Sequence, residues 1–321
     1  MPDDGQDGPG TPAPPSTPDA PAAAPPAPGG QDGSDDAPTT GTVRRRTVGE
    51  FARWWTVTRH QLAHYVRSYR FLGLLAFVGF ISLLTLAFQL DAGVDAVRIQ
   101  QLNKSSEYLS NFLDYTGLWI ILAAAFFAGD ALSVDFSTGT GYYMLVLPVR
   151  RRTLLAGRYS AAIVVTLAIV AVYYVAAFLG GVYFFGASAI RWDLAALSFG
   201  IAALFTLAAL AVAFTMSAFF RSPAAGVLVT VLVLYVGFTT LQGVVELAGV
   251  EPWFSLTYAG GAMAAILDTD FVHFQSIPLG EDQYYTIWSA NVGEGVLIML
   301  GYLAVFLGLS AYLYGRKEST G

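Results

Sequence analysis

The segment YSAAIVVTLAIVAVYYVAAFLGGVYF, which covers Tyr159–Phe184, contains no charged residue. An α-helix needs about 20 predominantly apolar residues to cross the hydrocarbon core of a bilayer, and this segment is longer than that. A strand of a membrane barrel would instead show about 10 residues of alternating polarity, a pattern that this run lacks. The segment therefore predicts a membrane-spanning α-helix with enough length for some tilt.

Five more apolar runs surround this one. They cover residues 71–90 and 112–129 before it, and residues 194–220, 224–247 and 292–314 after it. The whole chain is 55% hydrophobic and 12% charged, with a mean hydropathy of +0.54, whereas a soluble domain has about 25% charged residues. We therefore expect an all-α polytopic membrane protein, with six transmembrane helices within residues 71–317.

Lysines and arginines are distributed unevenly between the segments that join these runs. With the N-terminus inside, 14 of the 17 basic residues fall on inner segments: Arg44, Arg45, Arg46, Arg53, Arg59, Arg67, Arg70, Arg150, Arg151, Arg152, Arg158, Arg221, Arg316 and Lys317. The other three, Arg98, Lys104 and Arg191, fall on outer segments. Because cytoplasmic loops are enriched in Lys and Arg, we expect both termini and the segment 130–158 to be cytoplasmic, and the loop 248–291 to lie outside.

The first 44 residues differ in composition from the rest of the chain. Before Arg44 they contain 11 of the 15 prolines together with seven aspartates, and they contain no basic residue. Such a segment buries too little apolar surface to offset the entropy lost on ordering it. Residues 1–44 therefore predict a disordered acidic tail rich in Pro and Ala, either a solubilising extension or an adaptor for a partner.

Residues 45–70 have the pattern of an amphipathic helix. Apolar and aromatic residues recur there at the three- and four-residue steps of a helix: Phe51, Trp54, Trp55, Thr58, Leu62, Tyr65, Val66 and Tyr69. An aromatic stripe opposite basic residues suits the headgroup region of an anionic leaflet. We expect an interfacial elbow helix anchored by Trp54, Trp55, Arg59 and Arg67; the simpler interpretation is an ordinary basic juxtamembrane segment.

Several kinds of chemical site are missing from the sequence. There is no Cys, which excludes thiolate metal sites and Cys nucleophiles. No His-Glu-x-x-His motif is present, and no Gly-Lys dipeptide is available for a phosphate-binding P-loop. His60 and His64 lie one helical turn apart, but without a nearby Glu ligand we interpret them as ordinary interfacial residues. The chain thus predicts no catalytic residues, no metal site and no cofactor bound directly, so ATP would have to act through a partner subunit.

Ionisable residues are rare within the apolar runs. Asp114, Glu246 and Glu294 lie near predicted outer ends, and Asp130 lies near an inner end. Proton and sodium relays place such groups deep in the membrane. Ion-coupled transport therefore has little support.

The inner segment 130–158 reads DALSVDFSTGTGYYMLVLPVRRRTLLAGR. It combines basic residues, Gly and Pro with apolar side chains at Tyr142, Leu145, Leu147, Leu154 and Leu155. We expect short amphipathic structure here and not a loose tether. A membrane protein that keeps such a segment in the cytoplasm usually presents it to a soluble protein, so we interpret it as a docking surface.

The order of these parts resembles a permease of the type-2 ABC exporter family, in which an elbow helix precedes the first span and a coupling helix joins the second and third. The coupling segment of that family typically reads as an acidic residue, Gly-Thr, a Leu-rich turn, Pro-Val-x-Arg and then Gly-Lys. The matching residues are Asp135, Gly139, Thr140, Leu145, Leu147, Pro148, Val149, Arg151, Gly157 and Arg158. Asp135 stands for the commoner Glu and Arg158 for Lys, and both replacements keep the charge.

The resemblance implies that a separate cytoplasmic ABC-type ATPase docks on residues 135–155. The residues expected at this contact are Asp135, Gly139, Thr140, Tyr142, Leu145, Pro148, Arg150, Arg151 and Arg152. Tyr142 and Leu145 would fill a groove on the ATPase, and the three arginines would meet acidic groups or lipid phosphates. A second permease, either identical or homologous, would complete the transporter in the lipids of the plasma membrane, and no nucleic acid is implied.

Two other classes of function stay open from the residues alone: a secondary transporter or channel, and a non-transporting membrane scaffold. No residue selects the transported substrate, and the outward direction of transport is implied only by the resemblance. Separately, Asn103-Lys104-Ser105 matches the N-glycosylation pattern on a predicted outer segment. Asn103 is therefore a possible glycosylation site.

Overall fold

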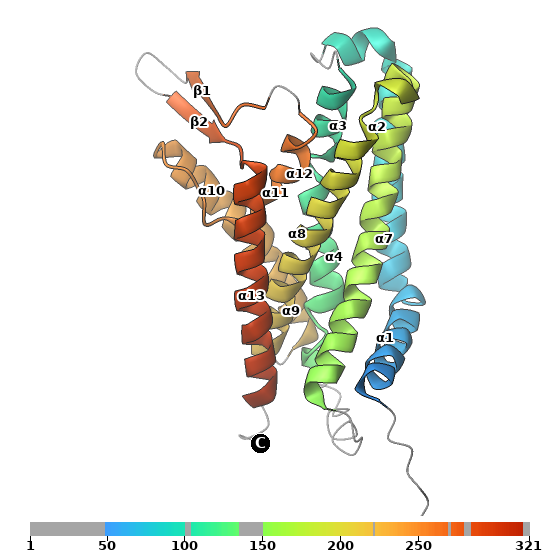
Figure 1. Cartoon of the computed structure of the whole chain (residues 1–321), viewed down its shortest axis with the longest axis vertical. Coiled ribbons are helices and arrows are strands. Elements are labelled where there is room, and N and C mark those ends of the chain that lie inside the picture. Colours follow the sequence, from blue (N-terminus) through green and yellow to red (C-terminus); the bar gives the residue numbers. More distant parts are fainter. Residues whose placement is uncertain are drawn as a thin grey trace, which may run out of the picture. The chain divides into compact units, whose positions relative to one another are not determined.

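Figure 1 shows the computed structural model of the chain, which describes residues 49–99, 104–134, 150–220, 222–268, 271–278 and 284–316. These residues all belong to one compact unit, residues 47–321. Its longer helices are α1 (Glu50–Val66), α2 (Tyr69–Ile99), α3 (Ser105–Leu113), α4 (Thr116–Ala128), α7 (Arg151–Phe185), α8 (Trp192–Phe219), α9 (Pro223–Val231), α10 (Phe238–Leu247) and α13 (Val292–Arg316). Shorter elements are η1 (Ala187–Ala189), η2 (Leu232–Gly237), α11 (Leu256–Gly260), α12 (Ala262–Ala265), β1 (Phe274–Pro278) and β2 (Tyr284–Trp288).

Six helical stretches in the described part of the chain are long and apolar enough to cross a membrane. They are Tyr69–Asp91, Ser105–Ala128, Arg151–Phe185, Trp192–Phe219, Pro223–Leu247 and Val292–Arg316. The prediction of an all-α protein with six membrane-spanning helices is confirmed. The side of the membrane on which each terminus lies stays a prediction, and so does the interfacial position of α1.

The helices differ in extent from the apolar runs. α7 begins at Arg151, although its charge-free part begins only at Tyr159, so part of the predicted coupling segment is helical stalk. In α2, Gly93 has φ 81° and ψ 175°, which breaks the helix before Ile99; only Gly adopts such a positive φ readily. The second span is interrupted at Asp114–Tyr115, between α3 and α4.

The centre of the bundle is formed by α8, which packs against α13, α4 and α7. Its buried face consists largely of small residues, including Ala202, Ala208, Ala209, Ala211 and Ala213. Small side chains let helix backbones approach closely, which is the main source of helix association in membranes. These small residues let α8 contact several helices at once in the middle of the bundle.

Several tyrosines join a helix to another helix or to a neighbouring loop through hydrogen bonds. The hydroxyl of Tyr159 donates to the carbonyl oxygen of Leu207 at 2.6 Å, and that of Tyr302 donates to Phe254 at 2.6 Å. Such bonds between membrane helices are worth about 0.6–1.7 kcal/mol each. These hydroxyls therefore help to hold the bundle's segments in position.

The two ends of the bundle differ in character (Figure 1). One end is formed by the starts of α1, α2, α7 and α9 and by the last turns of α4 and α13. We call it the basic end, because its described residues include Arg70, Arg150, Arg151, Arg152, Arg158 and Arg316. The opposite end carries α3, α10, α11, α12 and the antiparallel hairpin β1–β2, in which Phe274 pairs with Trp288. We call it the hairpin end.

Candidate coupling surface

The predicted docking residues fall into two groups. Asp135, Gly139, Thr140, Tyr142, Leu145 and Pro148 lie outside the described residues, as does the whole segment 135–149. Arg150, Arg151 and Arg152 are described, and they begin α7 at the basic end. The surface is therefore defined by the two flanks of the segment, which are residues 130–134 and residues 150–158.

The arginine triplet stands at the start of a helix. Arg150 is the N-cap of α7, and Arg151 and Arg152 are its first helical residues, with no acidic residue in that turn. Positive charge at a helix N-terminus opposes the helix dipole by about 0.3–1 kcal/mol. Arg150 pairs with Glu50 of α1 at 2.8 Å, but both side chains are largely exposed, so this pair contributes little. The positive charge of the triplet is thus unfavourable at this end of the helix.

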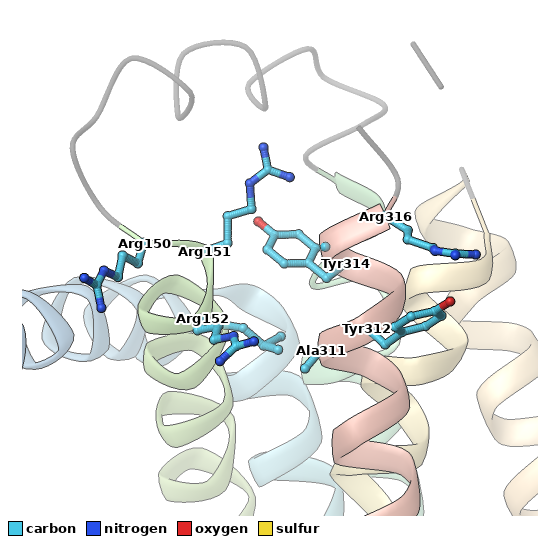
Figure 2. A pocket seen from close by; sticks show the side chains of 9 residues that line it. Arg150, Arg151, Arg152, Ala311, Tyr312, Tyr314 and Arg316 are labelled. Atoms are coloured by element: carbon cyan, nitrogen blue, oxygen red, sulfur yellow. The ribbon is translucent and has the colours of Figure 1, made fainter. Parts of the chain in front are cut away.

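A groove of about 640 Å³ opens between the start of α7 and the end of α13. It is lined by Arg150, Arg151, Arg152, Leu155, Ala311, Tyr312, Tyr314, Gly315 and Arg316. Figure 2 shows Arg151 reaching beyond the end of α7 next to Tyr314, and Arg152 lying between the two helices. The guanidinium of Arg316 lies 4.9 Å from the centre of the Tyr312 ring, within the range of a cation–π contact. The groove thus combines apolar walls with arginines, which suits an amphipathic segment that carries acidic groups.

The flank after α4 is held by neighbouring helices. Ser217 Oγ of α8 accepts hydrogen bonds from the backbone N–H groups of Leu132 and Ser133, at 2.9 and 3.2 Å. The carboxylate of Asp130 is nearly buried and forms an ion pair with Arg70 at the start of α2. These contacts fix residues 130–133, which precede the segment 135–149, against α2 and α8.

Arg158 connects this flank to α7. Its side chain is buried, and Nη1 donates to the carbonyl oxygen of Ala131 at 2.8 Å. The family resemblance expects Lys at this position; a guanidinium offers several donors in one plane, which lets it bond to a backbone carbonyl from a buried position. Both flanks of the segment 135–149 are therefore tied to each other as well as to the bundle.

Helix α1 packs along the beginning of α7. Gly157 makes this possible, because a methyl group at that position would lie 2.6 Å from Cγ1 of Val57. Thr58 and Tyr65 are buried, and the Tyr65 hydroxyl donates to the carbonyl oxygen of Phe127 at 2.8 Å. The predicted aromatic stripe is thus divided, since part of it faces the protein and only the rest faces outward.

The predicted interfacial anchors lie on both sides of this division. Trp55 is 55% exposed, whereas Trp54 is half-buried and packs against Phe51 with 5.3 Å between ring centroids. Arg59 and Arg67 are exposed. These positions leave one tryptophan and two arginines for contact with lipid headgroups.

Sequence reasoning missed the residues that support the surface from behind. Ser217 and the pairing of Arg70 with Asp130 carry no motif, and Gly157 is named only as part of the coupling-segment match, not for its packing on Val57; each acts through a partner far away in the chain. Only the small size of Gly157 gave a usable signal for a close helix contact. Asn103, the possible glycosylation site, lies outside the described residues.

A comparison with known families gives one match. The profile of the family described as ABC-2 family transporter protein matches residues 55–319. The match begins within α1 and includes all six candidate spans and the segment 135–149. Among curated proteins, no match was found.

Proposed function

The chain belongs to the ABC-2 family of transporter proteins, and we propose that it is the permease of an exporter whose ATPase docks at the basic end. Membership makes the chain a type-2 ABC transporter permease, an integral membrane component that works with an ABC-type ATPase. The proposal adds the docking site, the outward direction and the partners. In this account both termini and the basic end face the cytoplasm, and the transporter lies in the plasma membrane.

Docking at residues 135–155 is supported most strongly by the two flanks of the segment 135–149. Both flanks are packed into the helix bundle. Asp130, Leu132 and Ser133 are held by α2 and α8 on one side. On the other side the chain enters α7 directly at Arg151. Force that reaches these flanks would therefore act on α2, α8 and α7.

Helix α7 is longer than the hydrocarbon core of a bilayer is thick. Its 35 residues correspond to about 52 Å at about 1.5 Å per residue, while the hydrocarbon core of a bilayer is about 30 Å thick. Because the charge-free part starts at Tyr159, the turns that carry Arg151 and Arg152 project beyond the core. Force applied to these arginines would therefore act on one continuous helix that also crosses the membrane.

Motion of α7 would pass to its neighbours through specific contacts. The Tyr159 hydroxyl is bonded to Leu207 in the central helix α8 at 2.6 Å. Close packing of Gly157 against Val57 links α7 to α1. We infer that ATP-driven closure of the ATPases moves α7, α8 and α1 together and so alternates access from the two sides.

ATP would be bound and hydrolysed in the partner subunit. The permease would contribute the apolar contacts of Tyr142 and Leu145, and Gly139, Thr140 and Pro148 would belong to the same docking segment. Asp135 and the triplet Arg150–Arg152 would supply the charged contacts. The substrate of the exporter is not selected by any of these residues.

A second permease, either identical or homologous, would cover part of the bundle's outer surface. The spans Val292–Arg316, Pro223–Leu247 and Tyr69–Asp91 are only 11%, 17% and 22% buried, compared with 67% for Trp192–Phe219. Exposed apolar side chains on these spans, such as Leu228 and Leu297, need lipid or protein around them. We assign this surface to membrane lipids and to the partner permease.

Docking is tested by co-purification of the permease with its cognate ABC-type ATPase. Leu145→Asp and Gly139→Trp should abolish association while the variants still insert into the membrane. Val272→Asp is the matched control, since Val272 is 61% exposed at the hairpin end, and it should retain the ATPase. Full retention of the ATPase by both docking variants would refute the proposed site.

A further inference from the structure

Three potential metal ligands from separate segments meet at the hairpin end. Glu251 follows α10, His273 precedes β1, and Glu294 lies in the first turn of α13; one ligand atom from each lies within 4.8 Å of the others. His273 Nε2 and Glu251 Oε1 are 3.5 Å apart. Ligand atoms around a tetrahedral zinc ion are separated by about 3.3 Å when their bonds to the metal are about 2.0–2.1 Å long. A small closure of the three side chains would therefore supply three of the four ligands of a tetrahedral site, with water as the fourth.

The ring of His273 is oriented as a metal ligand would be. Its Nδ1 lies 3.0 Å from the carbonyl oxygen of Ser289, and because a carbonyl oxygen only accepts, Nδ1 carries a proton. In the neutral ring the lone pair is then on Nε2, which faces Glu251. Histidines that bind metals usually donate their other N–H to a carbonyl or a carboxylate. The Trp288 ring packs edge-on against the imidazole at 5.5 Å between centroids and limits its rotation.

The two carboxylates carry negative charge that the surrounding segment does not balance. Residues 250–291 contain no Lys or Arg. The Tyr258 hydroxyl donates to Glu251 Oε1 at 2.5 Å and lies 3.4 Å from Glu294 Oε2. A divalent cation would offset the repulsion between the two glutamates.

We propose that Glu251, His273 and Glu294 bind a divalent transition metal ion, with Zn²⁺ the best fit. One imidazole nitrogen with two carboxylate oxygens suits zinc, whereas Mg²⁺ and Ca²⁺ prefer oxygen ligands alone. The three side chains are partly exposed, so an ion has access from solvent. The metal would clamp the loop after α10, the β1–β2 hairpin and α13 together. This inference does not depend on where the ATPase docks.

The test is a titration of the full-length, untagged protein in detergent, stripped with a chelator and then exposed to Zn²⁺ or Mg²⁺ in a calorimeter. Ligand variants are His273→Gln and Glu294→Gln. The double variant His60→Gln with His64→Gln is the matched control, because these exposed histidines on α1 are the other described histidines and lie at the basic end. Melting temperatures measured in chelator verify that each variant is folded; should His273→Gln fail to fold, Glu251→Gln replaces it.

The site predicts about one Zn²⁺ per chain, no comparable binding of Mg²⁺, and a higher melting temperature with Zn²⁺ than with chelator. Loss of a ligand should weaken Zn²⁺ binding by about 10-fold or more, since even the loss of a supporting residue costs that much. The control should bind as the wild type does. An absence of stoichiometric binding would overturn the proposal, as would unchanged affinity in either folded ligand variant.

Discussion

Gly129 and Gly226 meet backbone to backbone where the end of α4 crosses the start of α9. A methyl group on Gly129 would lie 2.9 Å from Cα of Val227, and one on Gly226 would collide with the carbonyl oxygen of Gly129. Because both obstacles are backbone atoms, no rotation of a side chain relieves them. This crossing holds α9 against the helix that leads into the segment 135–149.

Gly226→Ala is expected to lower the free energy of unfolding by about 1–3 kcal/mol, the usual cost of overpacking a tight contact. Gly200→Ala is the matched control, because Gly200 lies in α8 and a methyl group there meets nothing within 4 Å. That variant should be neutral or slightly stabilised, since Ala favours helix by about 0.5–1 kcal/mol over Gly. Thermal unfolding of both variants in one detergent measures the difference; equal melting temperatures would contradict the close crossing.

The contact between α1 and α7 predicts that a second substitution compensates for the first. Gly157→Ala places a methyl group 2.6 Å from Val57 Cγ1 and should destabilise the protein. Val57→Ala removes the nearest obstructing atom, Cγ1, but leaves Cβ at 2.9 Å from the new methyl group, so it should restore only part of this loss. Residues in direct contact typically show coupling energies of about 0.5–3 kcal/mol. Additive effects in the double variant, measured by thermal unfolding, would show that α1 does not pack on Gly157.

The ion pair between Arg70 and Asp130 should matter more than the exposed pair on the other end of the bundle. Asp130 is only 9% exposed at its side chain, and losing a charged hydrogen bond there should cost about 1 kcal/mol or more. Asp193→Asn is the control, because Asp193 and Arg191 are 60% and 63% exposed and should contribute nothing measurable. The measurement compares the fall in melting temperature caused by Asp130→Asn with the fall caused by Asp193→Asn. Similar falls would contradict the larger contribution of the Arg70–Asp130 pair.

Tyr65 should make the protein sensitive to alkali. Burial, and then the negative charge of Asp130, raise its pKa to about 12, whereas an unfolded tyrosine ionises near about 10. As the pH rises, the unfolded state therefore loses the Tyr65 proton before the folded state does. The stability that the neutral, buried phenol contributes is complete below about pH 10 and is lost as the pH rises through about 12. Tyr65→Phe should cost about 1 kcal/mol near pH 7, because it removes the hydrogen bond to Phe127.

The measurement is the difference in melting temperature between the wild type and Tyr65→Phe as the pH rises from about 9 to about 11.5. The difference should shrink, because only the wild type carries this ionising group. Tyr69→Phe is the control, since Tyr69 is 92% exposed, and its melting temperature should follow the wild type at every pH. A constant difference for Tyr65→Phe would show that the phenol is not buried.

The membrane spans could be predicted because a charge-free run such as Tyr159–Phe184 is a local property of the sequence. The interruptions within the helices could not be predicted, because a hydropathy average covers many residues and hides single positions. The break at Gly93, the gap between α3 and α4, and the π-helical turn η2 each depend on single backbone angles or packing partners. The continuation of α7 to Arg151 was also missed, since three arginines in a row look like the end of a span.

The residues of the candidate sites could likewise be predicted only where they lie close together in the sequence. Arg150, Arg151 and Arg152 could be named from the sequence because they sit next to a recognisable motif. Their groove could not, because Tyr312 and Tyr314 come from the far end of the chain. Glu251, His273 and Glu294 could not be recognised as a group, because no ligand spacing links them and only the folding of three segments brings them together.

The central claim, that the ATPase docks on residues 135–155, is tested most directly by crosslinking from one position. The chain has no Cys, so Leu145→Cys creates a unique site for a maleimide photocrosslinker, and Val272→Cys provides the same at the hairpin end. On irradiation with the cognate ATPase, Leu145→Cys should form a covalent permease–ATPase adduct and Val272→Cys should form none. An adduct from Val272→Cys with none from Leu145→Cys would contradict the account.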